Sequence, residues 1–293
     1  IGPLPIMTAT VFVNGRITDA ASATIPVFDH GFLYGEGVYE TLRTYGRQPF
    51  LFVEHMNRLR HSAGLMNLAV PFTDEALLGH VRATMAAHGG DAEAYIRILL
   101  TRGIGDLSYR PDACPSPSLV IIVKALAAPP AWTIKKGIPV ALVGIRRNHP
   151  SALNPMMKSN NLLNNALAMQ EALRSGAEEA LMQNHDGDIV ECSQSNFFAV
   201  RGGEILTPPV AAGLLPGITR TYVMDLARAA GLPCREARLT PADLASIDEA
   251  FITGTTREIT PVVTIGGQIV GRGEPGAMTL RLLGAFHASV SSD

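Results

Sequence analysis

The sequence predicts an α+β protein of two domains. Strand and helix patterns are mixed along its 293 residues, and hairpin turns are frequent while strand–helix–strand alternation is weak. This combination favours α+β domains over a doubly wound sheet. The Pro129-Pro130 pair indicates a semi-rigid, extended linker. We therefore expect a smaller N-terminal α/β domain over residues 10–126, an interdomain linker over 127–136 and a larger C-terminal domain over 137–293.

The elements of the first domain follow from local patterns. Asn14-Gly15 is a typical hairpin turn between two short strands. From Val53 the apolar residues recur with helical spacing through Met66. Thr73 is suited to cap a second helix that ends at Gly89-Gly90. Strands are expected at 38–45, 95–101 and 119–123, with a long loop at 103–111 that could carry function.

The second domain is expected to open with a strand at 139–145 and a helix at 161–175. A meander follows, with turns at Asp186-Gly187 and Gly202-Gly203. Helices at 217–230 and 274–290 bracket strands near 249–253 and 261–265. The pattern is that of a second α+β domain.

Composition excludes several classes of function. Apolar residues make up 47% and charged residues 17% of the chain, as in soluble enzymes. The net charge of −2, without a cationic block, disfavours nucleic acid and membrane partners. Three widely spaced cysteines predict a reducing, cytoplasmic setting. The eight histidines show no metal-ligand spacing, so no metal site is expected.

Lys158 is the first candidate for chemistry. It is one of four lysines, and it lies between an apolar Pro-Met-Met segment and a helical pattern. A partly desolvated amine is suited to Schiff-base chemistry. A lysine whose stem packs and whose ammonium reaches water is the simpler explanation, and the stretch alone favours it.

Two turns in the same half of the chain are suited to a phosphate. Gly217, Ile218 and Thr219 start a helix pattern and offer free backbone N–H groups. Thr255 and Thr256 follow a strand and offer hydroxyl and amide donors. Taken singly, each is more simply explained as a capped helix or an ordinary turn.

Two charged residues complete the candidate set. Glu191 ends a strand, where it could pair with a protonated heterocyclic nitrogen, and Arg58 lies off its apolar stripe, where it could reach an anion. Solvated surface charges are the alternative for both. Taken together, an amine, phosphate anchors and a carboxylate suit one cofactor, pyridoxal 5′-phosphate.

The chain also resembles a known family, the fold-type IV pyridoxal-phosphate enzymes or class IV aminotransferases, over nearly its whole length. The motifs that carry the resemblance are residues 28–40 (FDHGFLYGEGVYE), 55–59 (HMNRL), 158–161 (KSNN), 191–196 (ECSQSN), 215–220 (LPGITR) and 255–261 (TTREITP).

The resemblance implies a cofactor between the two domains and assigns a role to each motif. Lys158 is the Schiff-base lysine and also the base that moves the substrate proton. Glu191 pairs with the pyridine nitrogen. The implied phosphate ligands are Arg58, Gly217, Ile218, Thr219, Thr255 and Thr256.

Three subfamilies share these motifs. Tyr34, Tyr39, Tyr95 and Arg97 resemble the substrate pocket of branched-chain aminotransferases. Thr101-Arg102-Gly103 and Lys158-Ser159 also resemble D-amino acid aminotransferases, and residues 102–105 resemble aminodeoxychorismate lyases.

Two residues depart from the branched-chain pattern. Leu162 stands where a tyrosine is common, and Arg257 occupies a turn that is usually small and lies where the substrate carboxylate would bind. The added guanidinium could change which acids or amines are accepted.

We therefore predict a homodimeric transaminase that moves the amino group of a branched-chain L-amino acid to 2-oxoglutarate. A D-amino acid or amine transaminase, or an aminodeoxychorismate lyase, remains the alternative on the same fold. A binding domain without catalysis, with Lys158 purely structural, is a further alternative.

Overall fold

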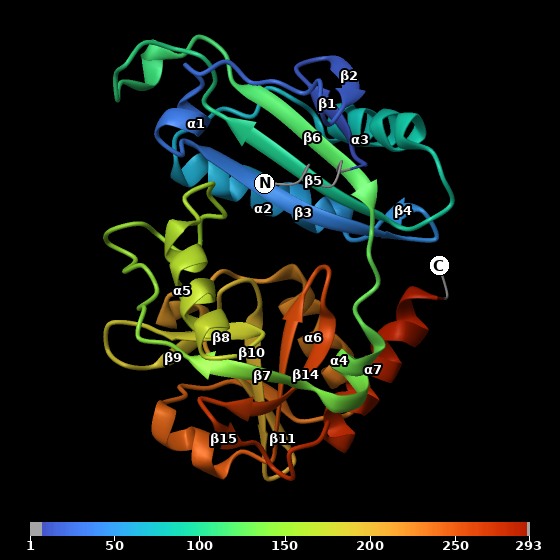
Figure 1. Cartoon of the computed structure of the whole chain (residues 1–293), viewed down its shortest axis with the longest axis vertical. Helices are drawn as coiled ribbons and strands as arrows, with labels where there is room; N and C mark the ends of the chain where they lie inside the picture. Colours follow the sequence, from blue (N-terminus) through green and yellow to red (C-terminus); the bar gives the residue numbers. More distant parts are fainter. Residues whose placement is uncertain (1–7, 292–293) are drawn as a thin grey trace. The chain divides into compact units, whose positions relative to one another are not determined.

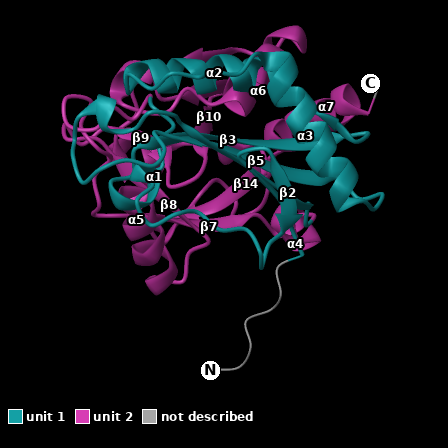
Figure 2. Ribbon diagram, turned by 90° about the horizontal axis from the view of Figure 1, so that it is seen from above, with its two compact units in different colours: residues 1–127, 157–161 teal, residues 128–156, 162–293 magenta. Residues whose placement is uncertain are grey.

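The computed structural model describes residues 8–291 (Figure 1), and the chain divides into two compact units. The first unit runs to Ala127 and also takes in Met157–Asn161, and the second holds Ala128–Met156 and everything from Leu162 onward. Figure 2 distinguishes the two units by colour. The short segment with Lys158 thus belongs by its contacts to the first unit. The domain limits expected from the sequence stay a prediction.

The first unit is built on an antiparallel sheet. Its strand order is β2-β1-β6-β5-β3-β4, and every neighbouring pair is antiparallel. The strands are β1 (Thr10–Val13), β2 (Arg16–Asp19), β3 (Gly37–Tyr45), β4 (Gln48–Pro49), β5 (Ala94–Thr101) and β6 (Ser118–Ala125). The helices are α1 (His30–Leu33), α2 (Phe52–Leu65) and α3 (Asp74–His88).

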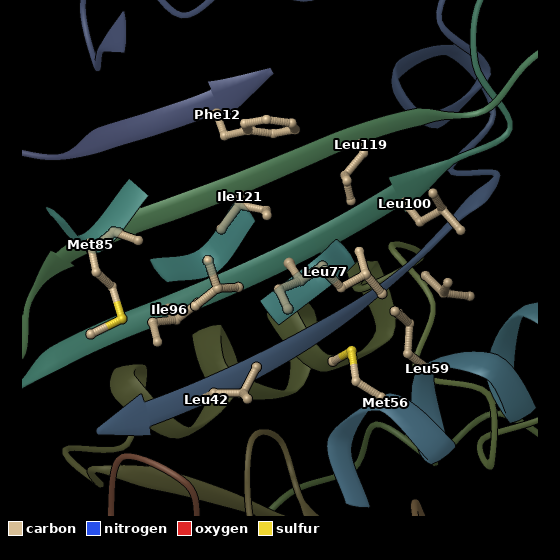
Figure 3. Packing of buried hydrophobic residues seen from close by; sticks show 14 of the residues in the cluster. Phe12, Leu42, Met56, Leu59, Leu77, Met85, Ile96, Leu100, Leu119 and Ile121 are labelled. Atoms are coloured by element: carbon tan, nitrogen blue, oxygen red, sulfur yellow. The ribbon is translucent and has the colours of Figure 1, made fainter. Parts of the chain in front are cut away.

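One face of this sheet carries the hydrophobic core of the unit. Met56 and Leu59 of α2 and Leu77 of α3 pack with Leu42 and Ile96 of the sheet in a single buried cluster (Figure 3). Successive side chains of a strand point to opposite faces. Tyr39, Arg97 and their neighbours at every second position therefore lie on the opposite face from the two long helices.

The segment that holds Lys158 pairs with the N-terminal part of β3. The amide of Tyr39 donates to the Lys158 carbonyl at 3.0 Å, and the amide of Asn160 donates to the Gly37 carbonyl at 2.8 Å. Met157 packs against the core cluster of this unit. The backbone of Lys158 is therefore fixed by strand-like pairing, which leaves only its side chain to move.

Gly37 is required where this segment meets β3, and Gly37→Ala is expected to weaken the pairing. A Cβ on Gly37 would lie 2.4 Å from Nδ2 of Asn160 and 3.0 Å from the Leu100 carbonyl. Relieving such an overlap typically costs about 1–3 kcal/mol. Urea unfolding should show a loss of this size. Gly64→Ala is the matched control, since a Cβ there would meet nothing within 4 Å and its helix should instead gain stability.

The second unit contains a larger mixed sheet that closes on itself. Its order is β12-β11-β10-β13-β14-β7-β8-β9, and β9 also pairs with β10, so six strands form a ring. Its strands are β7 (Ile138–Leu142), β8 (Glu179–Gln183), β9 (Ile189–Cys192), β10 (Asn196–Arg201), β11 (Glu204–Thr207), β12 (Cys234–Glu236), β13 (Glu249–Gly254), β14 (Glu258–Ile265) and β15 (Gln268–Ile269), the last paired with β14.

Helices and further buried clusters surround this ring. The helices are α4 (Ala131–Lys136), α5 (Leu163–Arg174), α6 (Ile218–Ala229) and α7 (Ala277–Val290). All six ring strands contribute to one core cluster, while α5 packs with β7 and β8 in a second. Through residues 8–291, no helix combines the length and the apolar character that crossing a membrane requires.

Most elements predicted from the sequence are present, with two corrections. Val53 is not part of the buried stripe of α2, because its side chain is 61% exposed; Phe52 takes that place and packs against the core. The predicted linker contains the short helix α4, which begins directly after Pro130. Proline is well tolerated at a helix start, a signal that the linker interpretation overlooked.

Candidate active site

The amine of Lys158 lies over an aromatic ring in the first unit. Its Nζ is 4.6 Å from the centre of the Tyr39 ring, and the guanidinium carbon of Arg97 is 4.0 Å from the same centre. Both cations are attracted by the negative π-face of the ring. The backbone amide of Lys158 donates to Oγ of Ser62 at 3.1 Å, which ties the residue to α2. Lys158 is thus a half-buried residue whose amine contacts the same ring as the Arg97 guanidinium.

Arg58 is engaged by a buried carboxylate. Its Nε and one terminal nitrogen bond the two oxygens of Glu40 at 2.7 and 2.8 Å, and Nδ1 of His55 lies 2.7 Å from Glu40. Burial opposes ionisation of Glu40, but the charge and hydrogen bonds of Arg58, with those of His55, lower the pKa of Glu40 to about 2. Burial, partly opposed by Glu40, lowers the pKa of His55. The triad fixes the side chain of Arg58.

The other predicted substrate residues of the first unit lie in different surroundings. Tyr95 shares the sheet face of Arg97, two positions away on β5, and has Nζ of Lys124 5.0 Å from its ring centre. Tyr34 contacts the ring of His30 at 4.9 Å and that of Tyr109, in the loop before β6, at 5.1 Å. The structure therefore brings Tyr39, Arg97 and Lys158 together, whereas Tyr34 contacts the β5–β6 loop.

Glu191 is embedded in a polar network of the second unit. One oxygen accepts from Nε of Arg147 at 2.7 Å. The other accepts from the amide of Leu215 at 3.1 Å and from Nδ2 of Asn196 at 3.3 Å. Glu191 is 5% exposed, so the interpretation as a solvated strand-end charge is wrong. The network holds the carboxylate in a fixed orientation beside a positive charge.

The N-terminus of α6 adjoins this network. Gly217 is the N-cap residue and makes no side-chain capping bond, so the first amides, those of Ile218 and Thr219, have no capping side chain. The approach to Asn196 is close: a Cβ on Gly217 would lie 1.9 Å from Oδ1 of Asn196. The backbone at this helix start therefore has room only for glycine.

Two buried hydroxyls near the same place lack partners. Across β9, β10 and β13, Glu191 pairs with Asn196 and Asn196 with Thr253, so these side chains share a face. The hydroxyls of Thr253 and Ser195 are buried and have no hydrogen-bond partner within residues 8–291. The Ser195 hydroxyl lies 3.6 Å from where a Cβ of Gly254 would be. Buried polar groups are normally satisfied, so this pair indicates a place for polar ligand atoms.

A tight turn between β13 and β14 carries the last predicted residues. The amide of Arg257 donates to the Gly254 carbonyl at 3.1 Å, which places Thr255 and Thr256 at the two central positions, both half-buried. The guanidinium of Arg257 lies 3.8 Å from the carboxylate of Glu179. Thr255, Thr256 and Arg257 thus follow the unpartnered Thr253 within four residues of the chain.

These donors fit pyridoxal phosphate chemically. The second unit offers helix amides without a capping side chain and unpartnered hydroxyls for a phosphate dianion, with a fixed carboxylate for the pyridine nitrogen. The first unit offers the amine of Lys158. Residue-by-residue reasoning on the sequence did not find Glu40, His55, Arg147 or Asn196. Only Glu40 gave a signal, as a charge that alternates with Val38 and Leu42 at the inward positions of its strand.

Comparison with known proteins agrees with this chemistry. Residues 37–265 match the family model for amino-transferase class IV. A protein of Methanocaldococcus jannaschii, provisionally named a branched-chain-amino-acid aminotransferase, is 39% identical over 276 residues, which are 94% of each chain. The D-alanine aminotransferase of Staphylococcus haemolyticus is 32% identical over 289 residues, covering 96% of this chain and 98% of its own.

Solved structures give the same result. The branched-chain amino acid aminotransferase of Escherichia coli superposes with a TM-score of 0.91 at 32% identity, covering 95% of this chain and 93% of its own. A second branched-chain amino acid aminotransferase, from T.th. and solved with pyridoxamine 5′-phosphate, gives a TM-score of 0.91 at 29% identity over 97% of this chain and 94% of its own. The chain therefore belongs to the class IV aminotransferases, enzymes of fold type IV that depend on pyridoxal 5′-phosphate, and it is close to the branched-chain amino acid aminotransferases.

Proposed function

We propose that the protein transfers the amino group of a branched-chain L-amino acid to 2-oxoglutarate. The observation that carries this proposal is the placement of the Lys158 amine and the Arg97 guanidinium on the same Tyr39 ring. A guanidinium can bind a substrate carboxylate, and an amine in contact with the same ring can act on the α-carbon. Tyr34 and Tyr95 are the proposed aromatic lining for the side chain, and Arg257 is the proposed partner of a substrate carboxylate.

When bound, the cofactor supplies an electron sink for the charge that develops at the substrate α-carbon. Lys158 is the residue proposed to hold it covalently. Once the amino group of the substrate has displaced the Lys158 amine, the freed Nζ would take the α-proton and pass it to the cofactor. The backbone of Lys158 is fixed by Ser62 and Tyr39, so the amine moves on a tethered side chain. This arrangement keeps one base close to both positions, as efficient general acid–base catalysis requires.

The remaining proposed residues hold the cofactor. The amides of Gly217, Ile218 and Thr219, the side chains of Thr255 and Thr256, and Arg58 are assigned to the phosphate. Glu191 is assigned to the pyridine nitrogen. The proposal requires both sets of residues, those of the first unit and those of the second, to serve one cofactor molecule.

Glu191→Gln is expected to slow amino transfer while cofactor still binds. The amide can occupy the same space but carries no negative charge, so it favours the uncharged ring nitrogen and weakens the electron sink. The expected loss in kcat is on the order of 10²-fold, the scale of losing one preorganised charge in an active site. Stopped assays of glutamate formation measure it. Asp188→Asn is a control, because it removes a carboxylate that pairs with the exposed Arg238; unaltered kcat in Glu191→Gln would remove Glu191 from this role.

A D-amino acid transaminase is the second candidate, and Leu162 is the observation that favours it. This residue replaces a tyrosine expected from the branched-chain resemblance, and the similarity to a D-alanine aminotransferase spans almost the whole chain. Matched pairs of L- and D-leucine, L- and D-alanine, and simple amines, each tested with 2-oxoglutarate, separate the candidates. Glutamate formed faster from D-alanine than from L-leucine would overturn the branched-chain assignment.

We further propose that the protein acts as a homodimer in the cytoplasm. Phe32, Leu107 and Tyr109 are 71%, 70% and 83% exposed around the β5–β6 loop, which supports burial of this surface by a second copy. The three cysteines, Cys114, Cys192 and Cys234, are free, which supports a reducing compartment. Light scattering on the purified holoenzyme should give about twice the chain mass of 31.2 kDa, and a monomeric mass would exclude the dimer.

A further inference from the structure

Glu179 is an ionisable residue of the second unit to which the proposed mechanism assigns no part. It is fully buried on β8, where one oxygen accepts from the Ala180 amide at 2.9 Å and from the Ser193 hydroxyl. The other oxygen, Oε2, has no hydrogen-bond partner within residues 8–291. A buried carboxylate oxygen without a donor is costly, so a nearby cation is needed to offset it.

Arg257 is that cation, but its contact with Glu179 is loose. The closest approach is 3.8 Å, which is beyond hydrogen-bond distance, and the Arg257 side chain is 30% exposed. Its backbone, by contrast, is held firmly: the amide bonds Gly254, and the carbonyl accepts from the Thr260 hydroxyl at 3.0 Å. The guanidinium therefore sits on a rigid turn while remaining able to exchange one carboxylate partner for another.

The charges of Glu179 and Arg257 both affect the neighbouring thiol of Cys192. Burial, together with the charge of Glu179, raises the pKa of its thiol well above the ordinary value, while Arg257 acts in the opposite sense. Glu179 and Arg257 thus act in opposite senses on the same neighbouring group. An incoming carboxylate would be repelled by Glu179 and attracted by Arg257.

We propose that Glu179 is a positioning residue that competes with the substrate carboxylate for Arg257 and so sets how strongly the enzyme prefers acids to uncharged analogues. The proposal rests on the assignment of Arg257 to the substrate carboxylate made above. Arg257 alternates between Glu179 and the substrate, and both partners engage the same guanidinium. A substrate that carries no carboxylate gains nothing from this exchange.

Binding of a non-reacting acid tests the proposal without turnover. The probe is 4-methylvalerate, compared with its uncharged amide, and the Kd for the holoenzyme is measured by calorimetry. Glu179→Gln should tighten binding of the acid about five- to tenfold, the scale of coupling between contacting charged residues, and leave the amide unchanged. Arg257→Ser should weaken binding of the acid. In the Arg257→Ser background, adding Glu179→Gln should no longer change the Kd of the acid. Glu178→Gln, next to it but exposed, is the matched control and should change neither Kd.

The binding measurements can contradict the proposed role of Glu179 in several ways. Weaker or unchanged acid binding in Glu179→Gln, or an equal effect in the Arg257→Ser background, would overturn the proposal. If Glu179→Gln does not fold, Glu179→Asp keeps the charge but withdraws it by one methylene, and should still tighten the acid measurably; no change would overturn it. The enantiomer and amine assays above test the substrate assignment separately, because the Kd cycle does not depend on which amino acid reacts.

Discussion

Replacing Lys158 with alanine is expected to lower the rate of amino transfer by about 10²- to 10⁴-fold, the usual contribution of a positioned acid–base group. The other cation on the Tyr39 ring, Arg97, cannot substitute as the base, because a guanidinium has only N–H donors and no acceptor for a proton. The measurement is single-turnover conversion of holoenzyme with L-leucine, followed by the visible absorbance of the cofactor.

The fold is expected to survive this change. The hydrogen bonds of Lys158 with Ser62 and Tyr39 are made by its backbone amide and carbonyl, which alanine retains. Thermal unfolding should therefore differ little from the wild type. Lys136→Ala, at the end of the exposed helix α4, is the matched control and should keep full activity. Borohydride reduction followed by peptide mass analysis should find the cofactor on Lys158; a label elsewhere, or retained turnover in the variant, would refute the assignment.

Local sequence rules predicted most of the elements that position the site. The Asn14-Gly15 turn, the Thr73 cap and the start of α6 at Gly217 depend on backbone conformations or capping chemistry that few residues provide. The edge pairing of Met157–Asn161 with β3 could not be predicted in this way. It joins residues about 120 positions apart, and no local pattern specifies which strand edge a short segment will occupy.

The interaction partners of the site residues could not be predicted from local sequence patterns either. Lys158, Glu191 and Arg257 stood out because of their types and neighbours, yet their partners Tyr39, Arg147 and Glu179 come from other strands and loops. Charge pairing in a closed sheet is decided by register, which the sequence specifies only through the packing of many residues at once. Reasoning from the sequence alone could therefore name candidate residues, but it could not predict which carboxylate would form an ion pair with which cation.

Glu40 offers the largest expected effect on stability. Glu40→Ala should lower the free energy of unfolding by about 3–5 kcal/mol, because it leaves Arg58 and His55 buried without their shared partner. Glu40→Gln should cost less, since the amide can still accept one hydrogen bond from Arg58. Urea unfolding at neutral pH measures both. Glu54→Ala, an exposed glutamate in the first turn of the same helix α2, is the control and should change stability by no more than a few tenths of a kcal/mol.

The pH dependence of this triad follows from the direction of each pKa shift. The folded pKa of Glu40 is lowered to about 2 from an ordinary 4.5, so its contribution is complete above 4.5 and is lost as the pH falls toward 2. The difference corresponds to about 3 kcal/mol. The pKa of His55 is also lowered in the folded state, mainly by burial, so below its ordinary 6.5 the unfolded chain takes up a proton that the folded chain refuses. Both groups therefore destabilise the fold upon acidification.

The pH range in which His55 acts and the range in which Glu40 acts can be separated with variants. Between pH 7 and 5 only His55 should contribute, so wild type and Glu40→Gln should both lose stability; between pH 4.5 and 3 the wild type alone should also lose the Glu40 contribution. The difference in the free energy of unfolding between wild type and Glu40→Gln should consequently become smaller as the pH falls below 4.5. A gap that stays constant across this range would mean that Glu40 is not ionised in the folded protein, and that no negative charge fixes Arg58. Because Arg58 is also the proposed phosphate ligand of the first unit, affinity for pyridoxal phosphate should fall together with stability in Glu40→Ala, as the guanidinium loses the two bonds that orient it.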